Sequence, residues 1–251
     1  MKYKISDGSM GSMEAVISST GGMVLSLKMD GEDIFFPYEF QKEKARGGCF
    51  VCAPWFGSSS FGEKKHGYFR DLEATDITIG ATDAAVKGQN AAKLTFEHHG
   101  NEKYPWEMSY ALQIYVRNRM FIMAFKIQRL DDGLFDRAPI NPAFHPYFKC
   151  QDASKVRLRG GGEDLYKNFS SNSIISPKKP AAQIMMPEKE ISMILSGGFN
   201  SDSKLVLWSD APEKYFCVEP LFKDKGLFNT PNGKYLNIGE SLELYLSLTI
   251  F

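Results

Sequence analysis

Three short segments of this chain place ionisable side chains among aromatic and apolar neighbours. The first is Asn141-Pro-Ala-Phe-His-Pro-Tyr-Phe148, in which His145 directly precedes a proline. That proline disfavours helix at His145 and favours an extended or turn conformation. A histidine half-buried by aromatic neighbours can titrate near neutrality and transfer protons. On this segment alone, a packed core histidine is the simpler interpretation, so partners elsewhere in the chain decide between the two.

The second candidate is Glu219, a carboxylate inside the otherwise apolar run Tyr215-Phe-Cys-Val-Glu-Pro-Leu221. Burial raises the pKa of a carboxyl group because desolvation disfavours its charged form. A carboxyl group in such a place is a candidate general acid or base. The alternative is a glutamate at the end of a strand that points to water, with Pro220 ending the strand.

The third segment is His66-Gly-Tyr-Phe-Arg70. Gly67 leaves space beside the imidazole of His66, and Arg70 offers a planar fork of hydrogen-bond donors. The alternative is a turn with an exposed histidine and a salt-bridged arginine. The other histidines, His98 and His99, are adjacent at the end of a predicted strand and point to opposite faces. We therefore expect them to be surface residues rather than a metal-binding pair.

Four cysteines in a chain of 251 residues do not make a disulfide framework. Cys49 and Cys52 form a C-x-x-C pair, whereas Cys150 and Cys217 are isolated. A zinc site would require a second pair or nearby histidines. The sequence therefore predicts buried free thiols in a reducing cytoplasm, with no metal and no cofactor.

The composition excludes several classes of function. Apolar residues make up 43% of the chain, charged residues 24%, and the formal net charge is zero. Without a basic stripe, nucleic acid is not an expected partner. No apolar run is long enough for a membrane span, and the first residues lack the apolar stretch of a signal peptide. A soluble cytoplasmic protein is expected, and its oligomeric state has no signal in the sequence.

The elements that must position these residues read as short strands separated by turns. Apolar residues alternate with polar ones over residues 108–116 and 242–250, which is typical of half-buried strands. Further strands are predicted at residues 16–18, 23–29, 76–79, 91–97, 120–130, 156–158, 203–209 and 215–218. Residues 47–62 and 170–182 are expected to be loops. No segment has a long helical period, so we predict an all-β, large antiparallel β-sandwich. The chain is predicted to be a single domain, with residues 1–12 as a flexible lead-in.

The three motifs together resemble the site motifs of the aldose 1-epimerase (galactose mutarotase-like) superfamily. Phe144-His-Pro-Tyr-Phe148, His66-Gly-Tyr-Phe-Arg70 and Cys217-Val-Glu-Pro-Leu221 occur in the family's order and at similar spacing. The segment Arg46-Gly-Gly-Cys-Phe-Val-Cys-Ala-Pro-Trp-Phe-Gly57 is similar to the glucose-6-phosphate 1-epimerase branch, and the His-Pro-Tyr-Phe form to the aldose 1-epimerase and LacX-like branches. The resemblance implies a galactose mutarotase-like supersandwich that interconverts the α and β anomers of aldoses without a cofactor.

The resemblance also implies roles for particular residues. His145 would be the general acid and Glu219 the general base. His66 would bind the sugar near its ring oxygen, and Arg70 and Arg46 would hydrogen-bond its hydroxyl groups. The family's substrate-binding aspartate has no clear match; Asp164 is taken as the candidate, with Asn168 nearby. Lys65 stands where the sugar-phosphate branch usually has glutamine.

The sequence leaves three functions open. The first is a mutarotase that acts on a hexose or hexose 6-phosphate, with that small molecule as its partner. The second is a non-catalytic carbohydrate-binding or regulatory protein on the same fold; the presence of both His145 and Glu219 argues against it. The third is an unrelated all-β hydrolase or metal-dependent enzyme, which the poor metal-ligand spacing disfavours. Arg46 and Lys65 hint at an anionic substrate.

Overall fold

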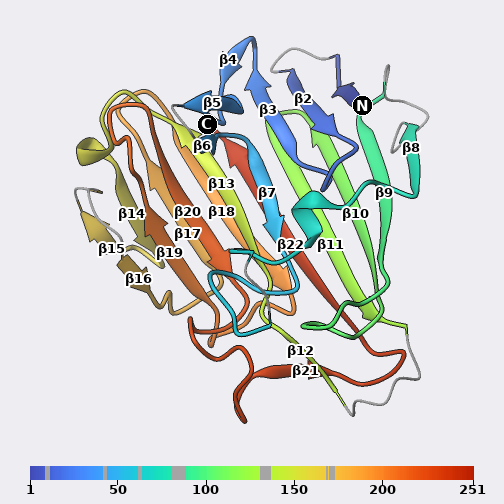
Figure 1. The fold of residues 1–251 in the computed structure, drawn as a ribbon. Coiled ribbons are helices and arrows are strands. Elements are labelled where there is room, and N and C mark those ends of the chain that lie inside the picture. Colours follow the sequence, from blue (N-terminus) through green and yellow to red (C-terminus); the bar gives the residue numbers. More distant parts are fainter. Residues whose placement is uncertain are drawn as a thin grey trace.

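The computed structural model describes residues 1–8, 12–41, 44–61, 64–80, 89–130, 137–167, 169 and 173–251. Within these ranges the chain folds into two large antiparallel sheets of nine strands each, with two short two-stranded ribbons beside them (Figure 1). The helical elements of the described residues are two short 3-10 turns. The predicted all-β antiparallel sandwich is confirmed.

The first sheet contains the strands that carry the candidate residues. Its hydrogen-bonded order is β1-β2-β3-β7-β13-β20-β19-β16, with β4 paired to β3. The bounds are β1 (Lys2–Ser6), β2 (Met13–Ser18), β3 (Val24–Met29), β4 (Glu32–Asp33), β7 (Cys49–Cys52), β13 (Ala143–Lys149), β16 (Ser173–Ile175), β19 (Lys204–Trp208) and β20 (Tyr215–Leu221).

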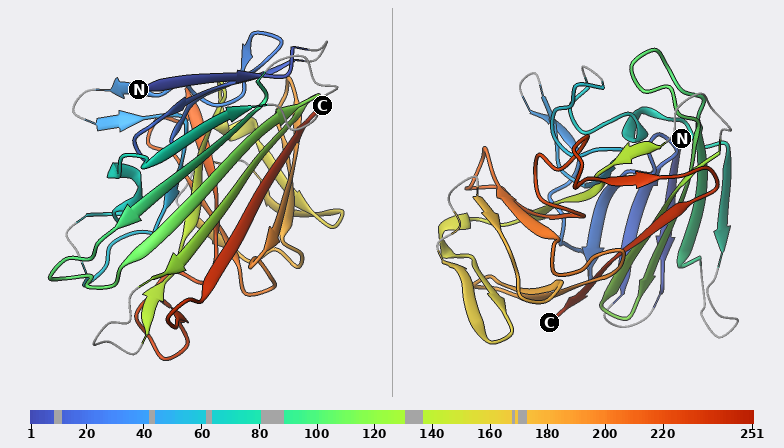
Figure 2. Two further views of the ribbon diagram at one scale, coloured as in Figure 1. Left: turned by 90° about the vertical axis from the view of Figure 1, so that its right-hand side faces the viewer. Right: turned by 90° about the horizontal axis from the view of Figure 1, so that it is seen from below.

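The second sheet has the order β15-β14-β17-β18-β22-β11-β10-β9-β8, and its long strands run side by side (Figure 2). The bounds are β8 (Asp76–Gly80), β9 (Ala91–His98), β10 (Met108–Arg117), β11 (Met120–Arg129), β14 (Arg157–Gly160), β15 (Glu163–Lys167), β17 (Ala181–Met185), β18 (Glu190–Gly197) and β22 (Ser241–Ile250).

Smaller elements complete the described part of the chain. One ribbon pairs β5 (Glu39–Gln41) with β6 (Lys44–Arg46), and the other pairs β12 (Ala138–Ile140) with β21 (Lys234–Leu236). The 3-10 turns are η1 (Phe69–Asp71) and η2 (Ala153–Lys155). The η1 turn carries Arg70 and β6 carries Arg46, so both arginines are held by short elements next to the first sheet.

The main core lies between the two sheets. On β10, β11 and β22 every second side chain is buried. Their inward residues join Leu27, Phe144 and Phe216 of the first sheet in one cluster of buried side chains. The period of two in the sequence therefore corresponds to one face packed on the core and one face turned outward.

Strands β13 and β20 are buried on both faces. Phe144 and Phe148 of β13 belong to the core between the sheets, whereas Ala143 and Tyr147 belong to a second, smaller cluster on the opposite face. Because successive side chains of a strand alternate between faces, His145 shares the face of Ala143 and Tyr147. This second face of the first sheet forms the floor of the candidate site.

The start of the chain differs from the predicted flexible lead-in. Lys2–Ser6 forms β1 and pairs with β2 along its whole length. Ile5 is fully buried in the main core and the other residues of β1 are polar or aromatic, so the sequence carries only one apolar anchor for this strand. Residues 9–11 lie outside the described ranges.

Two predicted loops also contain strands. Within residues 47–62, Cys49–Cys52 forms β7, whose four side chains are all buried, and β7 pairs with β13. Within residues 170–182, Ser173–Ile175 forms the edge strand β16. A strand buried on both faces has no alternation to detect, and a three-residue edge strand is too short to show one.

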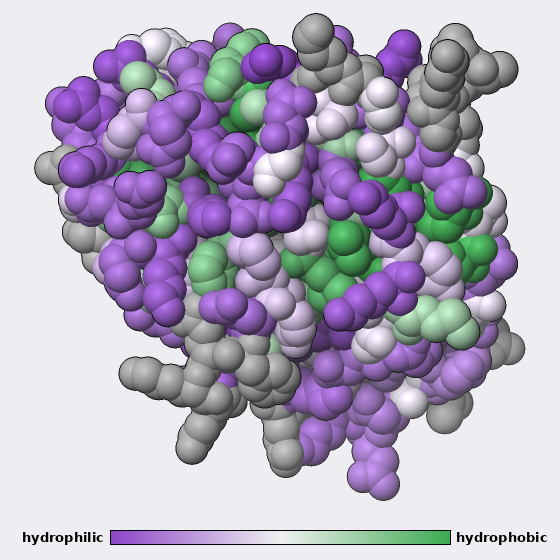
Figure 3. Space-filling model, turned by 90° about the horizontal axis from the view of Figure 1, so that it is seen from above, coloured by the Kyte–Doolittle hydropathy of each residue, from purple (hydrophilic) through white to green (hydrophobic). Residues whose placement is uncertain are grey.

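The face of the molecule seen from above is mostly hydrophilic (Figure 3). On the face drawn in Figure 3, the coloured hydrophobic residues gather only in small patches between polar and charged ones. Large exposed hydrophobic side chains include Tyr38, Leu130, Ile174, Ile194 and Ile238. No helix in the described ranges has the length and apolar character required to cross a membrane.

Candidate active site

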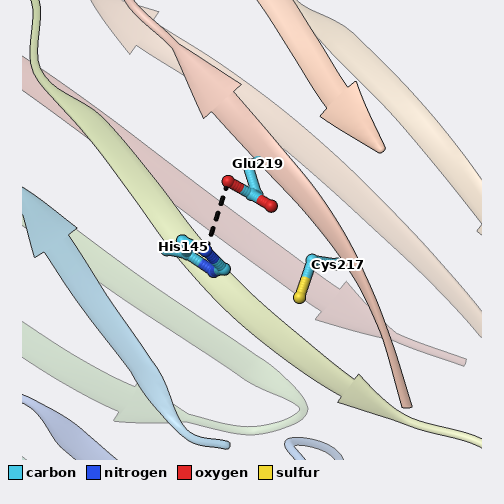
Figure 4. Close-up of side chains that lie close together, drawn as sticks. All are labelled: His145, Cys217 and Glu219. Atoms are coloured by element: carbon cyan, nitrogen blue, oxygen red, sulfur yellow. Dashed lines mark ion pairs between the residues drawn. The ribbon is translucent and has the colours of Figure 1, made fainter. Parts of the chain in front are cut away.

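His145 and Glu219 face each other across two neighbouring strands. Ala143 on β13 pairs with Leu221 on β20, and Tyr147 pairs with Cys217. This antiparallel register places residue 145 opposite residue 219. Figure 4 shows the imidazole and the carboxylate pointing toward one another, with Cys217 beside them. The distance from His145 Nε2 to Glu219 Oε2 is 3.4 Å.

Aromatic rings fix the orientation of the His145 imidazole. Phe50 of β7 stacks on one side, with ring centroids 4.6 Å apart, and Tyr147 stacks with a centroid distance of 4.8 Å. His145 itself is 5% exposed and Glu219 is 1% exposed. The two groups are therefore held in apolar surroundings and reach the solvent only through the cleft above them.

Neither group of this pair is fully satisfied in the described part of the chain. His145 Nδ1 and Glu219 Oε2 are buried and have no hydrogen-bond partner. Unpartnered buried polar atoms are rare in folded proteins and call for an explanation such as a bound ligand or a catalytic role. Here both atoms belong to side chains that line one cleft.

Burial shifts both pKa values of the pair. Desolvation raises the pKa of Glu219 to about 8, and Lys65 and Lys225 oppose this shift. Desolvation lowers the pKa of His145 well below its usual range, and the neighbouring His66 lowers it further. Near neutral pH the empty pair therefore holds one proton. This proton can lie on His145, which gives a charged imidazolium beside a carboxylate. It can also lie on Glu219, which gives a neutral imidazole beside a carboxylic acid.

His66 is held against the pair by a tight backbone connection. Its φ angle is 71° and that of Gly67 is 75°, both in the left-handed region. The Tyr68 and Phe69 N–H groups donate to the Ala53 carbonyl at 2.9 and 3.0 Å. A Cβ at residue 67 would lie 2.1 Å from that carbonyl oxygen, so only glycine fits there.

The hydrogen bonds of His66 define which nitrogen carries its proton. The Gly57 N–H donates to His66 Nδ1 at 3.2 Å, and the Cys52 thiol lies 3.3 Å from the same nitrogen. Burial, reinforced by nearby cations, lowers the pKa of His66 to about 3. A neutral imidazole that accepts at Nδ1 carries its proton on Nε2, so His66 is a hydrogen-bond donor at neutral pH.

The two predicted arginines have different environments. The guanidinium of Arg70 lies 5.7 Å from the centre of the Phe50 ring and has no carboxylate partner among the described residues. Arg46 forms a two-pronged ion pair with Asp210, at 2.6 Å from Nη2 and 3.0 Å from Nε, and lies over the Trp208 ring. Its charge is therefore largely compensated.

These residues surround a single cleft of about 740 Å³. A volume of this size fits a small-molecule ligand. Its wall includes five of the predicted site residues, namely Arg46, His66, Arg70, His145 and Glu219. The lining residues are Lys44, Ala45, Arg46, Phe50, Phe56, Gly57, Ser58, Ser59, Ser60, Lys65, His66, Arg70, His145, Tyr147, Val206, Trp208, Glu219, Lys225, Gly226, Phe228 and Asn229.

The structure does not bring Asp164 to this cleft. Asp164 lies on β15 at the edge of the second sheet, where it pairs with Arg159 at 2.8 Å and Lys167 at 3.1 Å. The predicted substrate contact is corrected accordingly, since two cations occupy its carboxylate. Asn168, the other candidate, lies outside the described residues.

The prediction that His98 and His99 are both surface residues is correct for only one of them. His99 is exposed, with 78% of its side chain accessible. His98 is buried and stacks on Tyr68, with centroids 5.1 Å apart and the rings nearly parallel. The two side chains do differ in exposure, as expected for neighbours that point to opposite sides. The side that carries His98 is covered by Tyr68, in the segment that follows His66.

Several residues of the cleft carried no local sequence signal. Trp208 ends β19 and Lys225 lies in the segment after β20, and neither belongs to a recognisable motif. Asp210, which neutralises Arg46, is 164 residues away from it in the sequence. A pairing at such a distance follows from the sheet order, which local patterns do not determine.

One cluster at the floor of the cleft contains metal-binding residue types. The ligand atoms of His145, Cys217 and Glu219 lie within 4.8 Å of one another. All four cysteines are free and buried, as predicted. Burial and the nearby Glu219 raise the pKa of the Cys217 thiol well above its usual range. A metal would have to displace that proton, so we describe the cluster as an acid–base pair beside a protonated thiol.

Comparisons with known proteins agree with this picture. The family model described as aldose 1-epimerase matches residues 1–213. No curated protein matches the sequence significantly. Among solved structures, a protein from Synechocystis sp. PCC 6803 superposes with a TM-score of 0.78 at 20% identity, covering 100% of this chain and 95% of that one.

Two further structures have the same fold. A galactose mutarotase-like protein from Clostridium acetobutylicum has a TM-score of 0.75 at 17% identity, with 99% of this chain and 95% of that chain covered. A galactose 1-epimerase from Lactobacillus acidophilus NCFM has a TM-score of 0.70 at 11% identity, with 100% and 98% covered. At these identities the likeness shows the fold alone.

Proposed function

This chain belongs to the aldose 1-epimerase family, and from that premise we propose that it is a mutarotase that interconverts the α and β anomers of a hexose or hexose 6-phosphate without a cofactor. The observation that carries the proposal is the His145–Glu219 pair. Its two groups form an ion pair at 3.4 Å, and each has a buried polar atom without a hydrogen-bond partner in the described part of the chain.

The reaction requires one base and one acid at the same carbon. In the ring form, Glu219 takes the proton from the anomeric hydroxyl while His145 gives a proton to the ring oxygen. The bond between C1 and the ring oxygen breaks and an aldehyde forms at C1. Rotation about the C1–C2 bond exposes its other face. The two groups then exchange roles as the ring closes, and the proton returns to His145.

The geometry suits this proton transfer. The anomeric oxygen and the ring oxygen are bonded to the same carbon, so two groups only 3.4 Å apart can reach both. The pair starts with its proton on His145 in the ring complex and carries it on Glu219 in the aldehyde complex. In the empty cleft the opposed burial effects favour the proton on Glu219, because they raise the pKa of the carboxyl group to about 8 and lower that of the imidazole. Transfer of the proton to Glu219 during ring opening is therefore assisted by burial.

His66 and the arginines have positioning roles in the proposal. His66 donates from Nε2, which suits a hydrogen bond to a sugar oxygen near the reacting carbon. Arg70 offers a second donor from the wall of the cleft. Arg46 is committed to Asp210, so we assign it to shaping the wall beside Trp208. The rings of Phe56 and Trp208 offer apolar surface to one face of the sugar.

The cellular setting is also part of the proposal. Four buried free thiols support a reducing cytoplasm. A non-catalytic carbohydrate-binding protein on the same fold remains the competing function. It would retain the His66 and Arg70 contacts but has no use for two buried ionisable groups, whose desolvation lowers stability.

Polarimetry tests the proposal. Freshly dissolved α-glucose, α-galactose and α-glucose 6-phosphate are followed to equilibrium with and without the protein, in the presence and absence of a chelator. We expect accelerated mutarotation of at least one sugar, unchanged by the chelator. A protein that binds a sugar without accelerating its mutarotation would have the non-catalytic function. Loss of activity on chelation would require a metal-dependent mechanism.

A further inference from the structure

Four cations of the cleft have no carboxylate partner in the described part of the chain. Lys44, Lys65, Arg70 and Lys225 line it, and none forms an ion pair with any residue that the structure describes. By contrast, Lys64 is paired with Asp71 at 2.8 Å, and Arg46 with Asp210. Glu219 is the one acidic side chain of the described cleft lining. The cleft therefore has an uncompensated positive charge on its solvent side.

We infer that Lys65 and Lys225, together with Arg70, recognise a dianionic phosphate on the sugar, remote from its anomeric carbon. The inference rests on the proposed function for the orientation of the sugar, since the anomeric carbon lies at His145 and Glu219. It assigns the anion to these three residues instead of Arg46, whose guanidinium already binds a carboxylate.

The positions of the two lysines support a site on the outer side of the pair. Lys65 directly precedes His66, and Lys225 follows the strand that carries Glu219. Both lysines are exposed, whereas His145 and Glu219 are buried at the floor. Both lysines lower the pKa of Glu219, where they oppose the effect of burial. They also lower the pKa of His66, where they act in the same direction as burial.

Hydroxyl groups lie beside these lysines. Ser58, Ser59 and Ser60 line the cleft after Gly57, which has a φ angle of 76°. The Asn229 amide donates to the Ser60 hydroxyl at 3.0 Å, which joins this serine segment to the segment that carries Lys225. Phosphate oxygens accept hydrogen bonds from hydroxyl and ammonium groups together, so the two joined segments offer a mixed donor set.

The amount of charge favours phosphate over carboxylate. A sugar phosphate carries close to two negative charges at neutral pH, whereas a uronic acid carries one. Four unpaired cations with one opposing carboxyl group leave a net charge of about three when Glu219 is ionised and four when it is protonated. A dianion compensates this charge more completely, and charge-assisted hydrogen bonds to phosphate are among the stronger polar contacts.

Substitution of both lysines tests the inference. The Lys65→Met, Lys225→Met double variant keeps most of the apolar stems and removes both charges. We expect its KM for glucose 6-phosphate to rise by at least ~10-fold, the effect of losing charge-assisted contacts, while kcat/KM for glucose changes by less than ~3-fold. Lys64→Met is the matched control, because Lys64 is adjacent, exposed and already paired with Asp71.

Two further measurements sharpen the result. Glucuronate, which has a carboxylate in place of the phosphate ester, should be a poorer substrate than glucose 6-phosphate. Raising the salt concentration should raise the KM for glucose 6-phosphate in the wild-type protein more than in the double variant. Equal kcat/KM for glucose and glucose 6-phosphate, or an unchanged KM in the double variant, overturns the inference. A preference for glucuronate overturns the assignment to phosphate.

Isothermal titration calorimetry separates this inference from the proposed function. Binding of glucose 6-phosphate that requires Lys65 and Lys225, in a protein that accelerates no mutarotation, would overturn the enzymatic function and retain the anion site. Mutarotation of neutral sugars without tighter binding of glucose 6-phosphate would overturn the anion site and retain the enzymatic function.

Discussion

Glu219 is held where its ionised form is disfavoured, and this has a cost in stability. Its pKa in the folded protein is about 8, above the ordinary value for an unfolded chain. The folded state therefore binds this proton more tightly than the unfolded state. That contribution to stability is fully present below the unfolded pKa of about 4.3 and is lost as the pH rises through the folded pKa.

The Glu219→Gln variant should therefore gain stability and lose activity. We expect the mutarotation rate to fall by ~10²–10⁴-fold, the usual contribution of general acid–base catalysis. The free energy of unfolding should rise by roughly 2–4 kcal/mol at pH 9 and much less at pH 5. Denaturant unfolding at the two pH values measures the difference. Glu163→Gln, at an exposed residue paired with Lys178, is the control and should shift stability by less than about 0.5 kcal/mol.

The same pair predicts the dependence of activity on pH. Above pH 8, Glu219 ionises and the pair loses its one proton, so kcat/KM should fall along an alkaline limb near that value. On the acid side, the lowered pKa of His145 should keep activity constant below pH 6.5. A pH–rate profile of kcat/KM reports the free enzyme. A single rise centred on pH 6.5 would contradict the assigned pair.

At this scale the sequence predicted the residues that a local motif marks. His145, Glu219, His66 and Arg70 all line the cleft. They could be singled out from the sequence because each is a polar side chain within or beside an apolar or aromatic run. Lys225 was not predicted, since a lysine in an exposed segment looks like any solvated charge. The commitment of Arg46 to a distant aspartate depends on tertiary structure and could not be predicted.

The segment from β7 to η1 positions His66, and Gly67 is its critical position. An alanine there would place its Cβ 2.1 Å from the Ala53 carbonyl oxygen at a φ angle of 75°. We expect Gly67→Ala to destabilise the fold by about 2 kcal/mol or more, through strain and a clash, and to lower kcat/KM by displacing His66.

Gly161→Ala is the matched control for this substitution. Gly161 also has a left-handed φ angle, of 64°, but its Cβ would meet open space. Its cost should be near 1 kcal/mol, from strain alone. Thermal unfolding of the two variants compares them directly. If both lose the same stability, the close contact at Ala53 does not restrain the His66 segment.

Strands could be predicted from the sequence where apolar and polar residues alternate along them. The long strands β10 and β22 follow from clean alternation, because one of their faces is buried. Strand β7 was read as a loop because both of its faces are buried. The pairing of β13 with β20, which brings the acid–base pair together, joins segments about 70 residues apart. No local pattern specifies that pairing.

For the whole molecule, we propose a single domain. One cluster of buried side chains includes Ile5 of β1 and Ile250 of β22, and it contains residues of both large sheets. Such a core should unfold as one unit. Denaturant transitions followed by tryptophan fluorescence and by far-ultraviolet circular dichroism should coincide. Two separated transitions would show that the sheets form independent units.

Exchange between anomers at equilibrium, observed by two-dimensional NMR, is the measurement on which this account depends most. With glucose, galactose and glucose 6-phosphate, the wild-type protein should produce exchange cross-peaks between the α and β C1–H signals of at least one sugar. The Glu219→Gln and His145→Asn variants should lose this exchange by at least ~100-fold while remaining folded. Undiminished exchange in either variant, or no exchange with any of the sugars, would contradict the proposed acid–base pair.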